Sequence, residues 1–161
     1  MTLPRLNSTT VRDAPYERTR LSNGIVHLGV GAFQRAHMAQ ATDAAIAASG
    51  DLRWGIVGVS LRSPETHDAL APQDGLYTLA IRDADQHGTP RERLQVIHCL
   101  RELLVAPDGL RAVHERIAAP ATRIVSLTVT EKGYLDTTPG STLDVLARGL
   151  ALRRARGGSG L

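Results

Sequence analysis

Apolar positions along the chain fall into short runs of two alternating kinds. One kind is β-branched and aliphatic, which is typical of strands buried on both faces of a sheet. The other kind is longer and rich in alanine, or has leucines at helical spacing, which is typical of helices. The predicted strands cover residues 24–30, 53–61, 76–83, 94–100 and 123–130, and the predicted helices cover residues 33–50, 63–70, 108–118 and 141–156.

Glycine, proline and hydroxyl residues mark the ends of several of these elements. Gly50 closes the first helix, where a left-handed C-cap favours glycine. Ser63 is the predicted N-cap of the second helix, with Pro64 at the first helical position, where no N–H is needed. Pro120 ends the third helix, and the polar segment 84–92 is a predicted turn between two strands.

The order of the elements predicts the fold class. Residues 24–61 combine a strand, a glycine turn, a helix and a strand, which indicates a βαβ unit with parallel strands. The expected class is therefore α/β, with a doubly wound, mostly parallel sheet and helices on both faces. A chain of 161 residues forms one domain, expected over residues 21–161. Residues 1–20 are polar and are predicted to form an arm lying over it.

Composition and charge exclude several classes of protein. The net charge is +3, but Lys132 is the only lysine and the arginines are scattered among acidic residues, so a nucleic-acid partner is not expected. Cys99 is the only cysteine, which excludes an internal disulfide, and no histidine spacing suits a metal ion. No apolar stretch approaches the roughly 18 residues of a membrane span, so we expect a cytoplasmic protein without membrane contact.

The stretch IVHLGVGAFQRAH (residues 25–37) forms a glycine-rich corner between a strand and a helix. Gly29 suits a tight turn, Gly31 allows a phosphate to approach the backbone, and Gln34 stands where a third glycine is usual. Arg35, in the first helical turn, is able to pair with a phosphate. Taken alone, the stretch leaves two interpretations open, a dinucleotide site and a structural turn.

Two other strand ends carry candidate polar groups. Arg62 and Glu65 follow the second strand, where an acid binds ribose hydroxyls and a base binds a 2′-phosphate. Glu131 and Lys132 leave the strand at 123–130, and Lys132 is either a general acid or base or a solvated side chain.

The histidines are expected to differ in role. His27 lies in the first predicted strand, where a satisfied and largely buried side chain is expected. His37 lies on the first predicted helix, close to the candidate phosphate loop.

Three stretches in this order resemble one known family. They are VHLGVGAFQRAH, WGIVGVSLR with QDGLYTL, and RIVSLTVTEKGY, and together they span most of the chain from about Leu21 onward. The chain is similar to the amino-terminal domain of the polyol-specific long-chain dehydrogenases, the group of mannitol dehydrogenase and fructuronate reductase (D-mannonate oxidoreductase). The lysine of TEKGY resembles the fructuronate reductase side of that group.

The resemblance implies a Rossmann domain that binds NAD and serves an oxidoreductase of carbohydrate metabolism. The glycine loop with its phenylalanine and arginine would hold the dinucleotide, an acid after the second strand the ribose, and Glu131 would lie near the nicotinamide. The cofactor-binding residues expected on these grounds are Gly29, Val30, Gly31, Ala32, Phe33, Arg35, Arg62, Glu65, Thr130, Glu131 and Lys132.

In the family, the catalytic lysine and its asparagine and histidine helpers belong to a second, mostly helical domain. We therefore expect that domain to be absent from this chain, so that Lys132 is not the catalytic lysine and no catalytic residue is present. The isolated chain is expected to bind the dinucleotide at most weakly and not to turn over. The polyol or sugar-acid substrate would belong to the full-length enzyme. A non-catalytic nucleotide-binding module and an inactive fragment stay open as alternatives. A methyltransferase is disfavoured, because Ser60 and Leu61 stand where it needs an acid.

Overall fold

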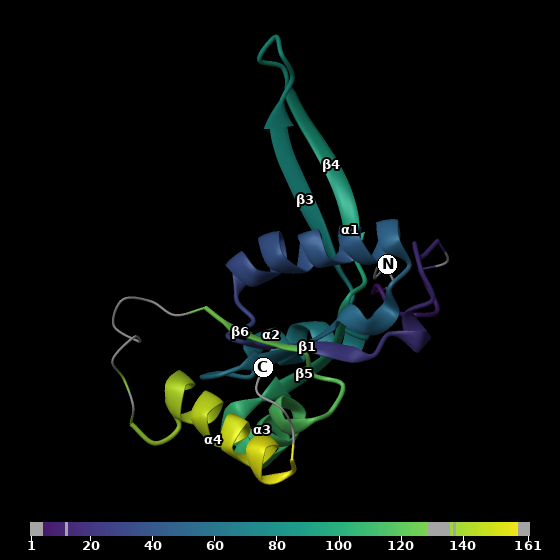
Figure 1. Ribbon diagram of the computed structural model, residues 1–161. Helices are drawn as coiled ribbons and strands as arrows, with labels where there is room; N and C mark the ends of the chain where they lie inside the picture. Colours follow the sequence, from purple (N-terminus) through teal and green to yellow (C-terminus); the bar gives the residue numbers. More distant parts are fainter. Residues whose placement is uncertain (1–4, 12, 129–135, 137, 158–161) are drawn as a thin grey trace.

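A four-stranded parallel sheet forms the centre of the molecule, with the order β5-β2-β1-β6 (Figure 1). The computed structural model describes residues 5–11, 13–128, 136 and 138–157. The strands are β1 (Asn23–Leu28), β2 (Gly55–Ser60), β5 (Leu100–Val105) and β6 (Ile124–Leu127). β1 pairs with β2 on one side and β6 on the other, so the strand order reverses beside β1. The expected doubly wound parallel sheet is confirmed.

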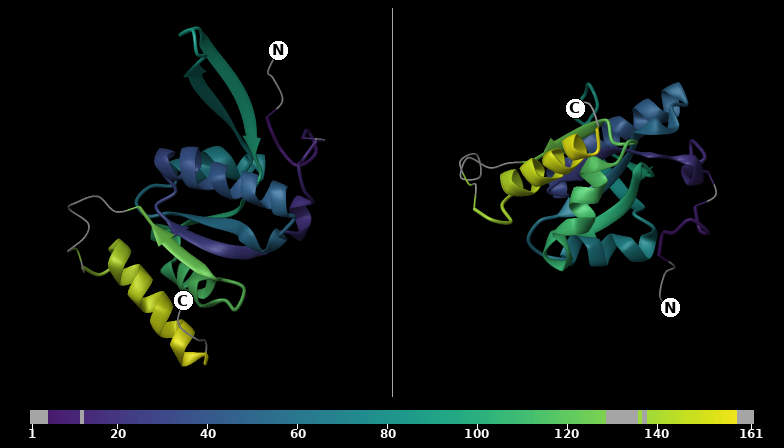
Figure 2. Two further views of the ribbon diagram at one scale, coloured as in Figure 1. Left: turned by 45° about the horizontal axis from the view of Figure 1, so that its top comes forward. Right: turned by 60° about the horizontal axis from the view of Figure 1, so that its bottom comes forward.

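Helices cover both faces of this sheet. α1 (Ala39–Ser49) continues a π-helical turn at Gln34–Met38 and covers one face, while α3 (Leu110–Ala118) and α4 (Thr142–Ala155) lie together on the other (Figure 2). A Cβ at Gly149 of α4 would lie 2.6 Å from the Ile117 side chain of α3. Glycine there lets the two helices approach closely.

The remaining elements are short. α2 (Glu65–Leu70) follows β2, and its N-cap position is Pro64, one residue later than the Ser63 predicted from the sequence. Short 3₁₀ turns cover Arg18–Arg20, Leu52–Trp54, Ala71–Gln73 and Ala106–Asp108.

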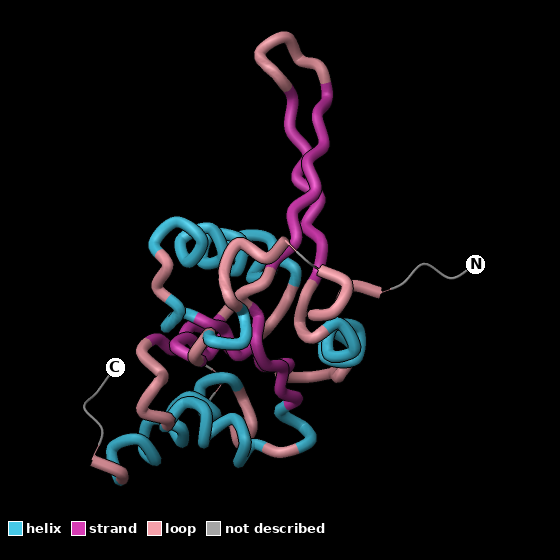
Figure 3. Tube along the Cα trace, turned by 90° about the vertical axis from the view of Figure 1, so that its right-hand side faces the viewer, coloured by secondary structure: helices cyan, strands magenta, loops and turns pink. Residues whose placement is uncertain are grey.

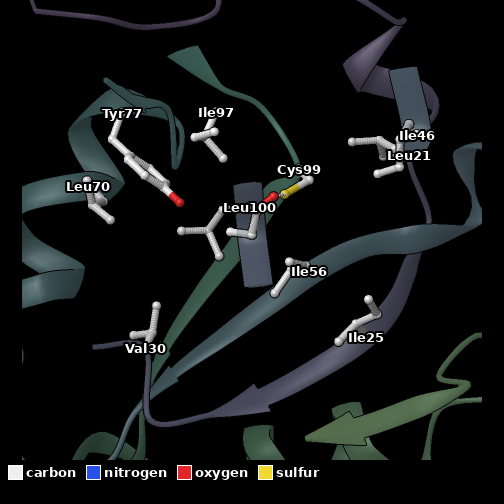
Figure 4. Close-up of a cluster of buried hydrophobic side chains, with 11 residues drawn as sticks. Leu21, Ile25, Val30, Ile46, Ile56, Leu70, Tyr77, Ile97, Cys99 and Leu100 are labelled. Atoms are coloured by element: carbon white, nitrogen blue, oxygen red, sulfur yellow. Dashed lines mark hydrogen bonds between the residues drawn. The ribbon is translucent and has the colours of Figure 1, made fainter. Parts of the chain in front are cut away.

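The apolar residues of the central strands alternate between two cores. Ile25 and Ile56 belong to the cluster that includes Ile46 of α1, which Figure 4 shows in close-up. Val26 and Val57 belong to the cluster on the side of α3 and α4. This alternation explains why apolar residues occupy successive positions in both strands, since each strand is buried on both faces.

The segment between α2 and α3 differs from the sequence-based expectation. β3 (Tyr77–Ala84) and β4 (Pro90–Ile97) pair antiparallel in a separate two-stranded sheet that projects from the body (Figure 3). The strand predicted at 94–100 is in fact the end of β4 followed by a break at 98–99 and the start of β5. Periodicity did not separate them, because a half-buried hairpin strand and a parallel edge strand have similar apolar content.

A buried carboxylate holds this break in place. Asp43 of α1 is 2% exposed, and its Oδ1 accepts hydrogen bonds from the backbone N–H groups of His98 and Cys99, each at 2.8 Å. The hydroxyl of Tyr16, in the amino-terminal segment, donates to the same oxygen at 2.5 Å. Arg18 adds hydrogen bonds to the carbonyl groups of His98 and Leu100. One carboxylate therefore joins the amino-terminal segment, α1 and the break between β4 and β5.

The charge on Asp43 is favoured by its partners. Burial alone would raise the pKa of this carboxyl, but hydrogen bonds from His98 and Tyr16 outweigh it and bring the pKa below its ordinary value. Cys99 is fully buried, and its thiol donates to the carbonyl of Ala39.

Replacing this carboxylate destabilises the fold. Asp43→Ala leaves two buried N–H groups and the Tyr16 hydroxyl without their acceptor, so we expect the free energy of unfolding at pH 7 to fall by about 2 to 4 kcal/mol. Urea unfolding followed by circular dichroism measures the change. The exposed Asp68→Ala serves as control and should change stability by less than about 0.5 kcal/mol.

The difference between wild type and Asp43→Ala also depends on pH. Since the folded pKa of Asp43 is depressed, its charge stabilises the fold above the unfolded pKa of about 3.9. That contribution is lost as the pH falls through the folded value. The two proteins therefore converge in stability in acid, and a difference of the same size at pH 7 and pH 3 contradicts this role.

Candidate functional site

A pocket of about 320 Å³ opens where the carboxyl ends of β1, β2 and β6 meet. In an open α/β sheet, ligands bind outside these strand ends, at the point where the strand order reverses. The residues that line the pocket are Gly29, Val30, Gly31, Ser60, Leu61, Arg62, Ser63, Thr66, Thr128 and Thr142.

The glycine loop after β1 forms the centre of this pocket. Gly29 has φ 98°, a conformation that disfavours any side chain, and its N–H donates to the carbonyl of Val59 at 2.9 Å. The N–H of Gly31 donates back to the carbonyl of Gly29 at 2.7 Å, which closes a tight turn. A Cβ at Gly31 would have only that carbonyl within 4 Å, at 3.9 Å, so the space above it is open. Glycine is thus favoured at position 29 by the backbone conformation and at position 31 by the space that it leaves open.

The helix that follows the loop begins directly after Gly31, which lines the pocket. The first turn of a helix has N–H groups without intrahelical partners and carries the positive end of the dipole, which favours an anion. Gln34, at the usual position of a third glycine, is 1% exposed, and its side-chain amide has no hydrogen-bond partner among the described residues. The adjoining π-helical turn widens the helix at this point.

Arg35 supports the loop from behind. Its Nη1 donates to the carbonyl of Val30 at 3.0 Å and to the hydroxyl of Thr66 at 3.5 Å, while Tyr77 donates to the Arg35 carbonyl at 2.7 Å. Arg35 thereby links the loop to α2 and to the base of the hairpin, and it does not line the pocket.

Ala32 and Phe33, two other predicted residues, lie outside the pocket lining. Both are exposed, Phe33 by 67% of its surface, and the Phe33 ring lies 4.6 Å from that of His37, centroid to centroid. The structure therefore places these side chains on the surface beside the loop.

The end of β2 contributes hydroxyl groups and one cation. Of the two residues predicted here, Arg62 lines the pocket, whereas Glu65 is exposed on α2 and does not. Ser60 is 6% exposed, and its hydroxyl has no hydrogen-bond partner among the described residues, so it is available to a ligand. No acidic side chain lines the described part of the pocket.

Thr128 and Thr142 complete the pocket on the side of β6. Thr142 begins α4, whose N-cap Ser141 accepts a hydrogen bond from the N–H of Asp144. Thr130, Glu131 and Lys132 were predicted for this side, and they lie outside the described residues. Sequence reasoning missed both threonines. In the sequence, Thr128 directly follows a buried strand and Thr142 begins a helix. Such positions identify the ligand-binding edge of the sheet only when the order of the strands is known.

His27 lies beneath this side of the pocket. It is 3% exposed, its Nδ1 lies 2.8 Å from the Ser126 hydroxyl, and its Nε2 lies 3.1 Å from the Thr128 hydroxyl. Burial lowers the pKa of the imidazole, only partly opposed by a hydrogen bond with the Gly29 backbone. The expectation of a satisfied, buried histidine is confirmed.

A second pocket, of about 390 Å³, lies at the far edge under the amino-terminal segment. Three of its charged side chains have partners: Asp74 accepts from Ser8, Glu102 pairs with Arg116, and Arg18 donates to backbone carbonyls. The fourth, Arg101, has a buried Nε without a hydrogen-bond partner among the described residues. The pocket at the glycine loop is the candidate functional site because it lies at the strand ends where the order of the sheet reverses.

Two other features are absent from the described residues. No helix among the described residues is long and apolar enough to cross a membrane. Across residues 5–11, 13–128, 136 and 138–157, no cluster of histidine, cysteine, aspartate and glutamate is suited to hold a metal ion.

Comparison with known proteins gives one consistent family. Residues 23–161 match the family described as the mannitol dehydrogenase Rossmann domain. The chain is 45% identical over 121 residues to mannitol 2-dehydrogenase of Pyrenophora tritici-repentis, covering 74% of this chain and 20% of that protein. It is 41% identical over 134 residues to that of Phaeosphaeria nodorum, covering 82% of this chain and 22% of the relative.

Solved structures agree with the sequence comparison. A substrate-free D-sorbitol dehydrogenase superposes with a TM-score of 0.83 at 28% identity, covering 98% of this chain and 38% of its own. The ternary complex of Pseudomonas fluorescens mannitol 2-dehydrogenase with NAD and D-mannitol superposes with a TM-score of 0.81 at 34% identity. The superposition covers 96% of this chain and 37% of the chain in that complex. The chain thus spans about a fifth to a quarter of the length of the curated relatives that it matches.

The two loop glycines should respond differently to the same substitution. Gly29→Ala places a side chain at positive φ, so we expect it to lower the free energy of unfolding by about 1 to 3 kcal/mol. Gly31→Ala points a methyl group into open space and should change it by less than about 0.5 kcal/mol. Urea unfolding of the pair measures both, and equal effects would contradict the assigned geometry.

Proposed function

Since this chain belongs to the mannitol dehydrogenase family, whose Rossmann domain it matches, we propose that residues 21–161 bind NAD in the pocket at the glycine loop. Residues 1–20 would serve as an arm that supports this domain. The observation that carries the proposal is the position of the pocket, directly above the strand β1 where the order of the sheet reverses.

The residues present fit a dinucleotide. The backbone of Gly29–Gly31 and the start of the following helix would hold the pyrophosphate, because Gly31 leaves open space and the helix dipole attracts anions. Arg35 would act by bracing that loop, while Val30, Ala32 and Phe33 would shape its two sides. The Ser60 hydroxyl, buried without a partner in the described structure, supplies a hydrogen bond that a ligand is able to complete.

The two halves of NAD would lie on opposite sides of the loop. Arg62 and Glu65 would face the adenosine ribose from the end of β2, while Thr130, Glu131 and Lys132 would serve the nicotinamide end. When bound, the nicotinamide ring supplies the hydride acceptor or donor. This chain's part is to bind and orient the cofactor.

The reaction of the complete enzyme would be the interconversion of a secondary alcohol and a ketone in a polyol or sugar acid. The relatives named mannitol 2-dehydrogenase support a polyol. The lysine of TEKGY, which resembles fructuronate reductase, supports a mannonate or fructuronate pair. We place this enzyme in the cytoplasm, which agrees with the single cysteine of the chain.

Catalytic groups for this reaction would lie outside the present chain. Removing hydride from an alcohol also requires a group that takes its proton, usually a side chain whose pKa lies near the working pH. In the described part of the pocket the lining residues are glycine, valine, leucine, serine, threonine and arginine, none of which titrates near neutrality.

Calorimetric titration with NADH tests the binding proposal. The 161-residue chain should bind NADH with a dissociation constant below about 1 mM, and Gly31→Ala should weaken binding at least about tenfold, because its methyl group meets the pyrophosphate. Gly109→Ala is the matched control, since Gly109 has an extended backbone and open space and lies away from the pocket. Absence of NADH binding by the wild type would overturn the proposed function.

Turnover assays test the assignment of catalysis elsewhere. The same chain, saturated with cofactor, should neither oxidise mannitol with NAD nor reduce fructuronate with NADH, because no described pocket residue moves a proton. Absorbance at the NADH band follows both reactions. Measurable turnover by the purified chain would place a catalytic residue within it.

A further inference from the structure

His27, a buried residue of the central strand β1, contacts a residue that lines the ligand pocket. It lies on β1 at the register position opposite Ser126 of β6, and its two ring nitrogens reach the hydroxyls of Ser126 and Thr128. Thr128 lines the pocket, whereas His27 and Ser126 do not. A chain of hydrogen bonds therefore runs from a fully covered position to the pocket wall.

The direction of these hydrogen bonds depends on which ring nitrogen carries the imidazole proton. The Ser126 hydroxyl is directed toward the Sδ of Met38 at 3.6 Å, which suits Ser126 as an acceptor of a proton on Nδ1 of His27. In that tautomer Nε2 accepts the proton of Thr128, and the lone pairs of the Thr128 oxygen are left to the pocket.

We propose that His27 is a positioning residue for the dinucleotide, because it orients the Thr128 hydroxyl so that its oxygen accepts a hydrogen bond from the bound cofactor. The inference rests on the function proposed above. The donors that such an oxygen selects are ribose hydroxyls and the carboxamide N–H groups of nicotinamide. His27 acts through Thr128 and touches no cofactor atom itself.

Backbone contacts show that this orientation is built into the sheet. The N–H of Thr128 donates to the carbonyl of Leu28 at 3.1 Å, which extends the β1–β6 ladder by one residue beyond β6. The hydrogen bond to His27 fixes the side chain of the same residue. Main chain and side chain of Thr128 are thus both held from β1, next to Gly29 of the loop.

Two substitutions at His27 separate its two hydrogen bonds. The side-chain amide of glutamine extends about as far as Nε2, so His27→Gln keeps a hydrogen bond with Thr128. The amide of asparagine reaches only the position of Nδ1, so His27→Asn keeps a hydrogen bond with Ser126 and loses the one with Thr128. We expect His27→Asn to weaken NADH binding at least tenfold, and His27→Gln to recover most of that loss. Thermal unfolding of both variants establishes that they fold.

A double-mutant cycle shows whether the effect passes through Thr128. Thr128→Val should weaken NADH binding about as much as His27→Asn does, and the double variant should be no weaker than either one alone. Thr128→Ser, which keeps the hydroxyl, should restore binding. In addition, ¹⁵N NMR of the imidazole should show the proton on Nδ1, with the Nε2 signal moving when NADH binds.

The outcomes separate this inference from the proposed function. Equal NADH affinities for His27→Asn and His27→Gln, additive losses in the double variant, or a proton on Nε2 would overturn the role of His27 while NAD binding stands. A wild-type chain that binds no NADH would overturn both. If the asparagine variant does not fold, the Thr128→Val and Thr128→Ser pair and the NMR measurement decide the question.

Discussion

The four central strands run parallel, and the rest of the molecule depends on that constraint. A parallel strand leaves its carboxyl end at the same edge as its neighbours, so every connection must cross a face of the sheet to begin the next strand. The crossing helices bury both faces, which accounts for two cores, and their N-termini gather at the edge where the strands end. The glycine loop, the end of β2 and Thr128 are neighbours for this reason alone.

The Asp43 carboxylate adds a second constraint at the opposite side of the fold. It replaces the regular strand hydrogen bonds that His98 and Cys99 lose where β4 ends and β5 begins. A buried charge is tolerated here because three donors surround it. The hairpin is thereby attached to the body without joining the central sheet.

The sequence predicted the parts of this fold whose causes are local. The unit from β1 to β2 was predictable because its strands are mostly apolar and Gly50, at positive φ, ends the helix between them. Pro120 likewise follows the end of α3. The break at His98 was not predictable, because it depends on a carboxylate more than fifty positions away. In the candidate site, the sequence predicted that the tight turn requires glycine at position 29. The bracing contact of Arg35 depends on Thr66, which only the tertiary fold brings near.

The projecting hairpin has two outer edges with unpaired backbone groups, and such edges invite pairing with other chains. Its outer half is charged: Arg82 pairs with Glu92 at 2.6 Å and Arg91 with Asp85 at 3.4 Å, while Pro90 removes one N–H donor where β4 begins. Of its apolar residues, Tyr77 and Ile97 are buried at the base, whereas Leu94 is 65% exposed. The charges and the proline therefore oppose edge-to-edge pairing along the outer half of the ribbon, and Leu94 is the position at which another chain would find apolar surface.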